Sequence, residues 1–161
     1  MPTKKVTMQR FIKLYRKESG NQSVTMAEVA EYAASKGWEL PKPRTGLERL
    51  AEQFAAAARE EVRRDEVTGR PYRANMAVTD YINGQQSTLW TDIDEASRPI
   101  AHKALKQRRN QMIGDAVHLA YDVEHWNRVN PGEMPIQMPL DFTDDVAEHM
   151  AADEGDNQEA A

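Results

Sequence analysis

The sequence predicts a mainly α protein with a small antiparallel β hairpin or meander, which is an α+β class. Apolar residues recur at helical spacing up to about residue 63 and again after residue 97. Between these stretches, apolar and polar residues alternate, which is typical of a half-buried strand. From Pro131 the composition becomes acidic, and this change predicts a disordered tail.

Three helices are expected in the first part of the chain. The first spans about residues 6–19 and can end at Gly20. Two capping boxes, Thr25–Glu28 and Thr45–Glu48, predict the starts of the second and third helices, because each pair can bond backbone N–H groups that lack a helical partner. The third helix is expected to run to about Arg63.

A hairpin or meander is expected next. Gly69 can take the left-handed conformation that a hairpin bulge needs, and Asn83-Gly84 offers a second tight turn before a strand over residues 86–93. One face of the intervening stretch holds alternating residues that predict a buried side, namely Tyr72, Ala74, Met76 and Val78.

A long helix is predicted over about residues 97–129, with Pro99 tolerated in its first turn. Gly114 inside it costs roughly 1 kcal/mol relative to Ala, which favours a close helix crossing there. One folded domain is therefore expected over residues 1–130, with a winged-helix-like core over about 6–93, followed by an acidic tail over 131–161.

Charge is divided unequally along the chain. Residues 131–161 contain nine Asp or Glu and no Lys or Arg, whereas the first 130 residues contain 21 Lys or Arg against 17 acids. The chain has no cysteine, which excludes disulfides and thiol nucleophiles and suits a reducing compartment. No apolar run is long enough for a signal peptide or a membrane span, so we expect a cytoplasmic protein without membrane contact.

Three helices followed by a hairpin is the order of a winged-helix module, in which the third helix enters the major groove of duplex DNA and the hairpin touches its backbone. Over residues 41–75, eight bases are interleaved with six acids, so a structural domain with a solvated hairpin is the alternative. The candidate DNA contacts on these two elements are Arg44, Arg49, Gln53, Arg63, Arg64, Arg70 and Arg73.

The long helix offers two further clusters. Five bases without an acid lie between Arg98 and Arg109, and they can extend a DNA footprint, receive the acidic tail or simply solvate the helix. His118, Asp122 and His125 share one helix face, and such a set can bind a metal. That face lies opposite the apolar stripe, which favours solvated surface. The sequence therefore predicts no metal, no cofactor and no catalytic residue, and a small metal enzyme is a third, remote class.

The tail contains one patterned segment, residues 135–142. Its Gln-Met-Pro-Leu-Asp-Phe resembles the Gln-Leu-x-Leu-x-Phe peptide by which many bacterial replication and repair proteins dock on the sliding clamp. The resemblance covers six residues and implies a polar pocket for the Gln amide and an apolar pocket for the later side chains. The implied partner contacts are Gln137, Met138, Leu140 and Phe142. Another partner, or a closing strand folded back on the body with Ile136, Met138, Leu140 and Phe142 buried, is the alternative.

Together these patterns suggest a non-enzymatic, DNA-associated accessory protein of bacterial DNA transactions. We expect it to contact double-stranded DNA through the third helix and the arginine-rich hairpin, and a protein partner through the tail, with the sliding clamp as one candidate. The alternative is a protein interaction or adaptor subunit without nucleic-acid contact.

Overall fold

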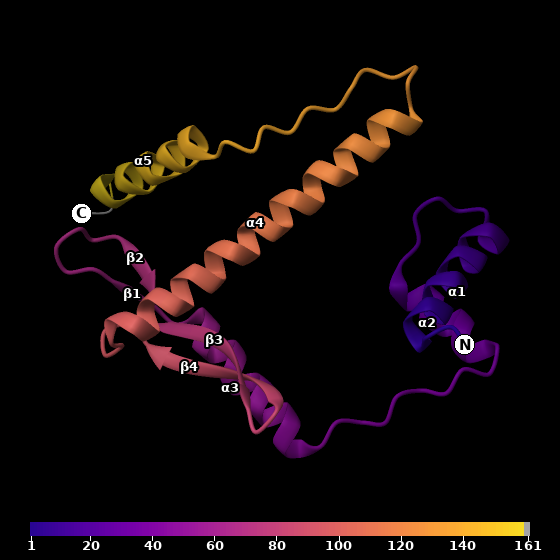
Figure 1. The fold of residues 1–161 in the computed structure, drawn as a ribbon, viewed down its shortest axis with the longest axis horizontal. Coiled ribbons are helices and arrows are strands. Elements are labelled where there is room, and N and C mark those ends of the chain that lie inside the picture. The colour runs from indigo at the N-terminus through magenta and orange to yellow at the C-terminus, as the bar shows by residue number, and fades with distance from the viewer. Residues whose placement is uncertain (160–161) are drawn as a thin grey trace. The chain divides into compact units, whose positions relative to one another are not determined.

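A computed structural model describes the backbone of residues 1–159 and the side chains of residues 1–156. It is an α+β fold, as predicted (Figure 1). The chain has two compact units, Met1–Arg49 and Leu50–Ala161, and the expected single domain over residues 1–130 stays a prediction. In chain order the elements are α1 Lys4–Ser19, α2 Met26–Ser35, α3 Gly46–Glu60, β1 Val62–Arg64, β2 Pro71–Arg73, β3 Asn75–Ile82, β4 Gln85–Asp92, α4 Arg98–Val129 and α5 Thr143–Glu159.

The first unit is a pair of helices, α1 and α2, held together by aromatic rings. The Phe11 ring lies 5.4 Å from that of Tyr32 and 5.3 Å from that of Trp38, measured between centroids. Helix α1 ends at Gly20, whose φ of 72° is left-handed. The predicted capping box is present at the start of α2, because the Thr25 hydroxyl accepts from the Glu28 N–H and the Glu28 carboxylate accepts from the Thr25 N–H.

The second unit contains two separate hairpins rather than one meander. Strands β1 and β2 pair with each other, and β3 pairs with β4, both antiparallel. Ala74 separates the hairpins, because its N–H donates to the Glu61 carbonyl and its own carbonyl accepts from Ile93. The tight turn expected at Asn83-Gly84 is present, and φ is positive at both residues, 52° and 75°, as in a type I′ turn.

The core of the second unit lies between β3 and α4. Met76, Val78 and Ala104 are buried together, and Ala74 is completely inaccessible. Gln107 of α4 holds the strand with its amide, which accepts from the Thr79 N–H at 3.0 Å and donates to the Thr79 carbonyl at 3.1 Å. These contacts fix the amino-terminal part of α4 on the hairpin and leave its carboxyl half outside the core.

The acidic tail differs from the prediction. Residues 143–159 form helix α5, so the disorder expected after Phe142 is wrong for this stretch. Local chemistry explains the helix start, because Asp141 accepts from both the N–H and the hydroxyl of Thr143. Acids in the first turn also interact favourably with the positive end of the helix dipole. The lack of large apolar side chains predicts disorder here, but these effects at the helix end favour the helix.

Two other expectations can be compared with the fold. Gly114 has no heavy atom within 4 Å of the position that a Cβ would take, so the close helix crossing expected there is wrong for the described residues.

Three helices do precede a hairpin, but the winged-helix arrangement itself stays a prediction. None of the described helices is both long enough and apolar enough to cross a membrane.

Candidate nucleic-acid interface

Arg63 of β1 is bound by three carboxylates of its own unit. Its guanidinium donates two bonds to Asp92, at 3.0 and 2.8 Å, and one to Asp94 at 2.8 Å. A fourth bond reaches Glu61 at 3.1 Å. Asp92 is the last residue of β4, so this arginine links the first hairpin to the end of the second.

The charges around Arg63 shift the protonation equilibria of the cluster. Hydrogen bonds from Arg63 lower the pKa of Asp92, and the bonds that Arg63 donates to Asp92, Asp94 and Glu61 raise its own pKa. Tyr72 donates to Asp94 at 3.0 Å, which raises the pKa of the phenol. A guanidinium whose N–H groups are already taken by carboxylates has few donors left for a phosphate. Arg63 is therefore built into the structure of the hairpins.

The other predicted hairpin arginines have different environments. Arg64 donates to the Gly69 carbonyl at 3.0 Å across the loop between β1 and β2. Arg70 forms an ion pair with Glu154 of α5, so the acidic tail reaches this loop. Arg73 is exposed at the end of β2 and lines a groove. Arg73 is thus the predicted hairpin residue whose position best suits a ligand contact.

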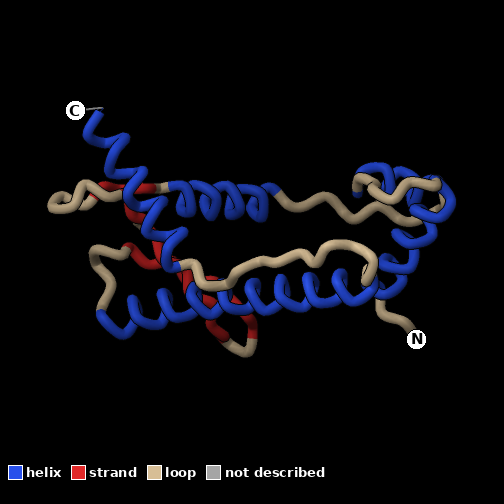
Figure 2. The backbone as a smooth tube through the Cα atoms, turned by 90° about the horizontal axis from the view of Figure 1, so that it is seen from above, coloured by secondary structure: helices blue, strands red, loops and turns tan. Residues whose placement is uncertain are grey.

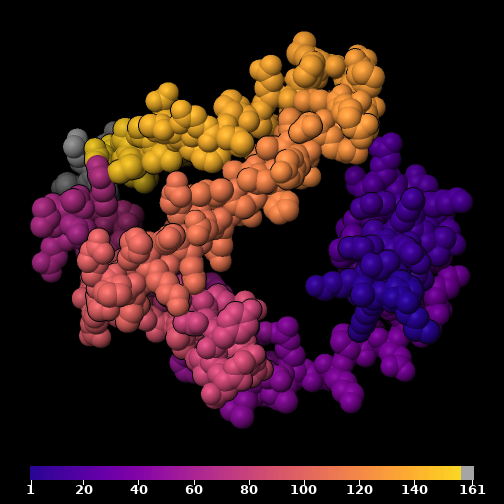
Figure 3. All heavy atoms as spheres, viewed as in Figure 1, coloured from indigo at the N-terminus to yellow at the C-terminus, as the bar shows by residue number. Residues whose placement is uncertain are grey.

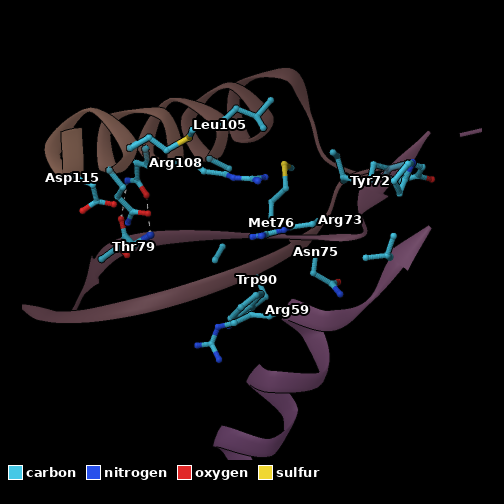
Figure 4. A pocket seen from close by; sticks show the side chains of 18 residues that line it. Arg59, Tyr72, Arg73, Asn75, Met76, Thr79, Trp90, Leu105, Arg108 and Asp115 are labelled. Atoms are coloured by element: carbon cyan, nitrogen blue, oxygen red, sulfur yellow. Dashed lines mark hydrogen bonds between the residues drawn. The ribbon is translucent and has the colours of Figure 1, made fainter. Parts of the chain in front are cut away.

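This groove has a volume of about 850 Å³ and lies around the hairpin formed by β3 and β4. Figure 4 shows Arg108 reaching from α4 toward Met76, whereas Arg59 and Trp90 lie together on the other face of the hairpin. The Arg59 guanidinium lies 5.5 Å from the centroid of the Trp90 ring, a cation–π contact. The groove therefore combines arginines with an aromatic side chain.

The remaining predicted contacts belong to α3 and the segment before it. Arg44 and Arg49 are in the first unit, and Gln53 is in the second. All three are exposed. The boundary between the units falls inside α3, so Arg49 and Gln53 lie one turn apart on the same helix although they belong to different units.

One basic surface lies outside the predicted set of DNA contacts. The sequence contains a signal for it, because most Lys and Arg of the first helix fall on the side away from its aromatic residues. Helix α1 has six exposed bases and one acid, Glu18, which accepts from the Tyr32 hydroxyl. Five of the bases share the half of the helix that faces away from Phe11 and Tyr15. We call them the α1 basic face, and they are Lys5, Arg10, Lys13, Arg16 and Lys17.

The two units also differ in net charge. The first unit has ten Lys or Arg against five Asp or Glu and carries +5. The second has eleven against twenty-one and carries −10, which together give the −5 of the whole chain. Attraction to a polyanion is consequently concentrated in the first unit.

The patterned tail segment lies along α4. Figure 2 shows the loop between α4 and α5 running beside the long helix, and Figure 3 shows its atoms next to those of the carboxyl half of α4. The Asn127 amide bonds both the N–H and the carbonyl of Ile136, each at 2.9 Å. Leu140 and Phe142 line a groove of about 520 Å³ with side chains of α4 that include Ile113, Ala116 and Val117.

The tail segment therefore folds back on the body, but it does so without forming a strand. Gln137 and Met138 are exposed, and Leu140 and Phe142 keep 41% and 45% of their surface accessible. The burial expected for a closing strand is wrong for these side chains, because the segment lies along α4 and they remain exposed there. Docking on a partner stays a prediction for this segment.

No cluster of three or more His, Cys, Asp or Glu side chains suitable for a metal was found within the described part of the chain. His118, Asp122 and His125 are exposed on α4. No family model matches the sequence, and no curated protein or solved structure is significantly similar to it. The functional interpretation therefore depends on the surfaces described above.

Proposed function

We propose that this chain is a non-enzymatic DNA-associated accessory protein, and that its main contact with duplex DNA is the α1 basic face. The observation that carries the proposal is the concentration of five exposed cations on one side of a helix in a unit of charge +5. Lys and Arg bind DNA by neutralising phosphates and releasing counterions, which needs exposed side chains without competing acids. These five cations meet that requirement better than Arg63 does, because three carboxylates surround Arg63.

The hairpin and α3 are the proposed secondary contacts. Arg73 is exposed beside a groove that also holds Arg59, Arg108 and Trp90, a combination of charge and aromatic surface that suits nucleic acid. The net charge of −10 on the second unit weakens such a contact at low salt, when repulsion of phosphates reaches furthest. This is why we place the main contact on α1.

The test compares two variants with the same change of charge. In the first, Lys13, Arg16 and Lys17 are replaced by Gln, and in the second, Arg64, Arg70 and Arg73 are replaced by Gln. Binding to a duplex of arbitrary sequence is measured as a function of salt. We expect the α1 variant to lose most of the affinity and its salt slope to fall by up to about 3, because each lost phosphate contact removes about one unit.

Each other outcome has a definite meaning. If only the hairpin variant loses DNA binding, the main DNA contact is the hairpin, as the winged-helix prediction states. Equal binding by both variants and the unmodified chain, or binding that does not depend on salt, would contradict the proposal. Circular dichroism of both variants verifies that the helices remain.

The tail segment 135–142 is the proposed contact for a protein partner, with a sliding clamp as one candidate. Docking through Leu140 and Phe142 requires both side chains to leave the groove on α4. Replacement of both by Ser would then abolish binding to a purified clamp, whereas Met134→Ser, an 88% exposed residue outside the segment, would not. Clamp binding by the double variant would exclude this mode of docking.

A second candidate function is a protein interaction or adaptor subunit without nucleic-acid contact. It is favoured by large apolar side chains exposed on α3, where Leu50 and Phe54 keep 47% and 69% of their surface accessible. Exposed apolar patches of this kind mark protein interaction sites. The two functions are distinguished by the DNA titration above, since the adaptor predicts no salt-dependent binding by any variant.

A further inference from the structure

Helix α4 carries a line of apolar residues with the spacing of a coiled coil. Positions 105, 109, 112, 116, 119, 123 and 126 follow one another at alternating steps of four and three residues. This repeat places the seven side chains along one side of the helix, where a second helix can pack. We call the six apolar members the α4 seam, and they are Leu105, Met112, Ala116, Leu119, Val123 and Trp126.

The seam is accessible to a partner. Leu105, Met112, Leu119 and Trp126 keep 50%, 61%, 41% and 38% of their surface exposed. Strand β3 covers the neighbouring side of α4 around Ala104, and Leu140 and Phe142 of the tail cover the side around Ile113 and Val117. Met112 and Ala116 also border the tail groove, so the seam runs between the two covered sides.

The two halves of α4 have opposite charge. Residues 98–113 contain five bases and no acid, and residues 114–129 contain three acids and one base. Among the bases, Lys103 already pairs with Asp80 at 2.7 Å. A parallel partner of the same sequence would place like charges side by side, whereas an antiparallel one would place each basic half beside an acidic half.

We propose that the α4 seam binds the same seam of a second copy of this chain, in antiparallel orientation. The repeat is in register when Leu105 lies beside Val123 of the other copy and Met112 lies beside Ala116. Residues 98–109 of each copy then lie along residues 119–130 of the other, which matches opposite charges. The pairing does not depend on DNA binding, and its test contains no DNA.

Arg109 is the one charged residue in the repeat. In this register it lies beside Leu119 of the other copy, one turn from the acid Asp122. Its long aliphatic stem can cover the seam while the guanidinium reaches that carboxylate. A polar residue at such a position specifies register and oligomer state in coiled coils. Arg109 therefore favours one fixed register of the two helices over registers that are shifted along the helix.

The first experiment measures molar mass by light scattering across a range of protein concentrations. The full chain should approach twice 18.3 kDa as the concentration rises. Leu119→Asp should remain at the monomer mass at the same concentrations, and His118→Asp, an exposed residue on the side of α4 that faces away from the seam, should assemble like the unmodified chain. A chain that stays monomeric, or a Leu119→Asp variant that still dimerises, would overturn the proposal.

The second experiment establishes the orientation, and it benefits from the absence of cysteine in the chain. In the antiparallel pair, the two Leu105 positions are separated by 18 helical residues, which is about 27 Å and too far for a disulfide. Leu105→Cys alone should therefore not crosslink. Mixed with Val123→Cys, it should give a disulfide-linked dimer under mild oxidation.

A disulfide formed by Leu105→Cys alone would show a parallel pair and would contradict the proposed orientation. Failure of the mixed pair to crosslink in a sample whose mass is dimeric would contradict the proposed register. Both cysteine variants keep an uncharged side chain on an exposed helix, and circular dichroism establishes that α4 has formed before the result is interpreted.

Discussion

At the level of single residues, Arg63 shows how much the surroundings of a side chain decide its role. In the sequence, Arg63 and Arg73 are equivalent members of an arginine-rich hairpin. In the fold, Arg63 is enclosed by Glu61, Asp92 and Asp94, while Arg73 is exposed beside a groove. The two aspartates follow Arg63 by about thirty residues, and the pairing of β3 with β4 together with the bonds of Ala74 brings them near it.

We expect Arg63→Ala to lower the thermal unfolding midpoint more than Arg73→Ala. The first change leaves three carboxylates close together without their cation, whereas the second removes an exposed side chain that has no such cluster around it. Unfolding of both variants, followed by circular dichroism, is the measurement. Equal midpoints would mean that solvent screens the cluster fully and that Arg63 does not stabilise the hairpins.

The same pair of variants predicts a pH effect. Arg63 lowers the pKa of Asp92 from its usual value of 3.8, so the folded state binds this proton less readily than the unfolded state. The resulting stabilisation is present above about pH 4 and is lost as the pH falls through the lowered pKa. The folded state should therefore lose less stability on acidification in Arg63→Ala than in Arg73→Ala. Identical pH profiles would contradict the assignment.

At the level of elements, local signals were sufficient to predict most of the fold. The capping boxes located the starts of α2 and α3, and alternation identified the buried face of β3. The position of Ala74 as a divider between two hairpins could not be predicted, because it depends on bonds to Glu61 and Ile93 from distant parts of the chain. Helix α5 differs from the prediction because its start depends on capping by Asp141 and on the helix dipole, whereas the low apolar content of the segment predicts disorder.

The turn between β3 and β4 should depend on Gly84, whose φ is 75°. We expect Gly84→Ala to destabilise the second unit by roughly 1–2 kcal/mol, since an L side chain in the left-handed region costs about that much. Gly132→Ala is the matched control, because that glycine has ordinary φ and open space around it. Chemical denaturation measures both. A Gly84→Ala variant as stable as the control would show that the turn can relax to another geometry.

At the level of the whole molecule, the chain separates opposite charges along its length. The first unit carries +5, the second −10, and nine of the acids in the second unit are in residues 131–161. The sequence showed the acidic tail directly. What it could not show is that the tail lies on α4 and reaches Arg70, since the Asn127–Ile136 bonds and the Arg70–Glu154 pair join residues that no sequence pattern relates.

This separation of charge predicts that the tail opposes DNA binding. Removal of residues 131–161 deletes nine negative charges, so affinity for duplex DNA should rise at low salt and converge with that of the full chain at high salt, where screening suppresses both attraction and repulsion. Deletion also uncovers the Ile113 and Val117 side of α4. The matched control therefore keeps Leu140 and Phe142 and replaces only the acids of residues 144–156 by Asn or Gln.

If charge is the cause, the control, which loses six of the nine negative charges, should recover most of the gain in DNA affinity of the truncated chain, and the gain of both over the full chain should shrink in parallel as salt is added. If the affinity for DNA rises only in the truncated chain, the inhibition is caused by the tail segment that covers α4. If neither variant binds more tightly than the full chain at low salt, the tail does not compete with DNA, and the basic first unit acts independently of the acidic second one.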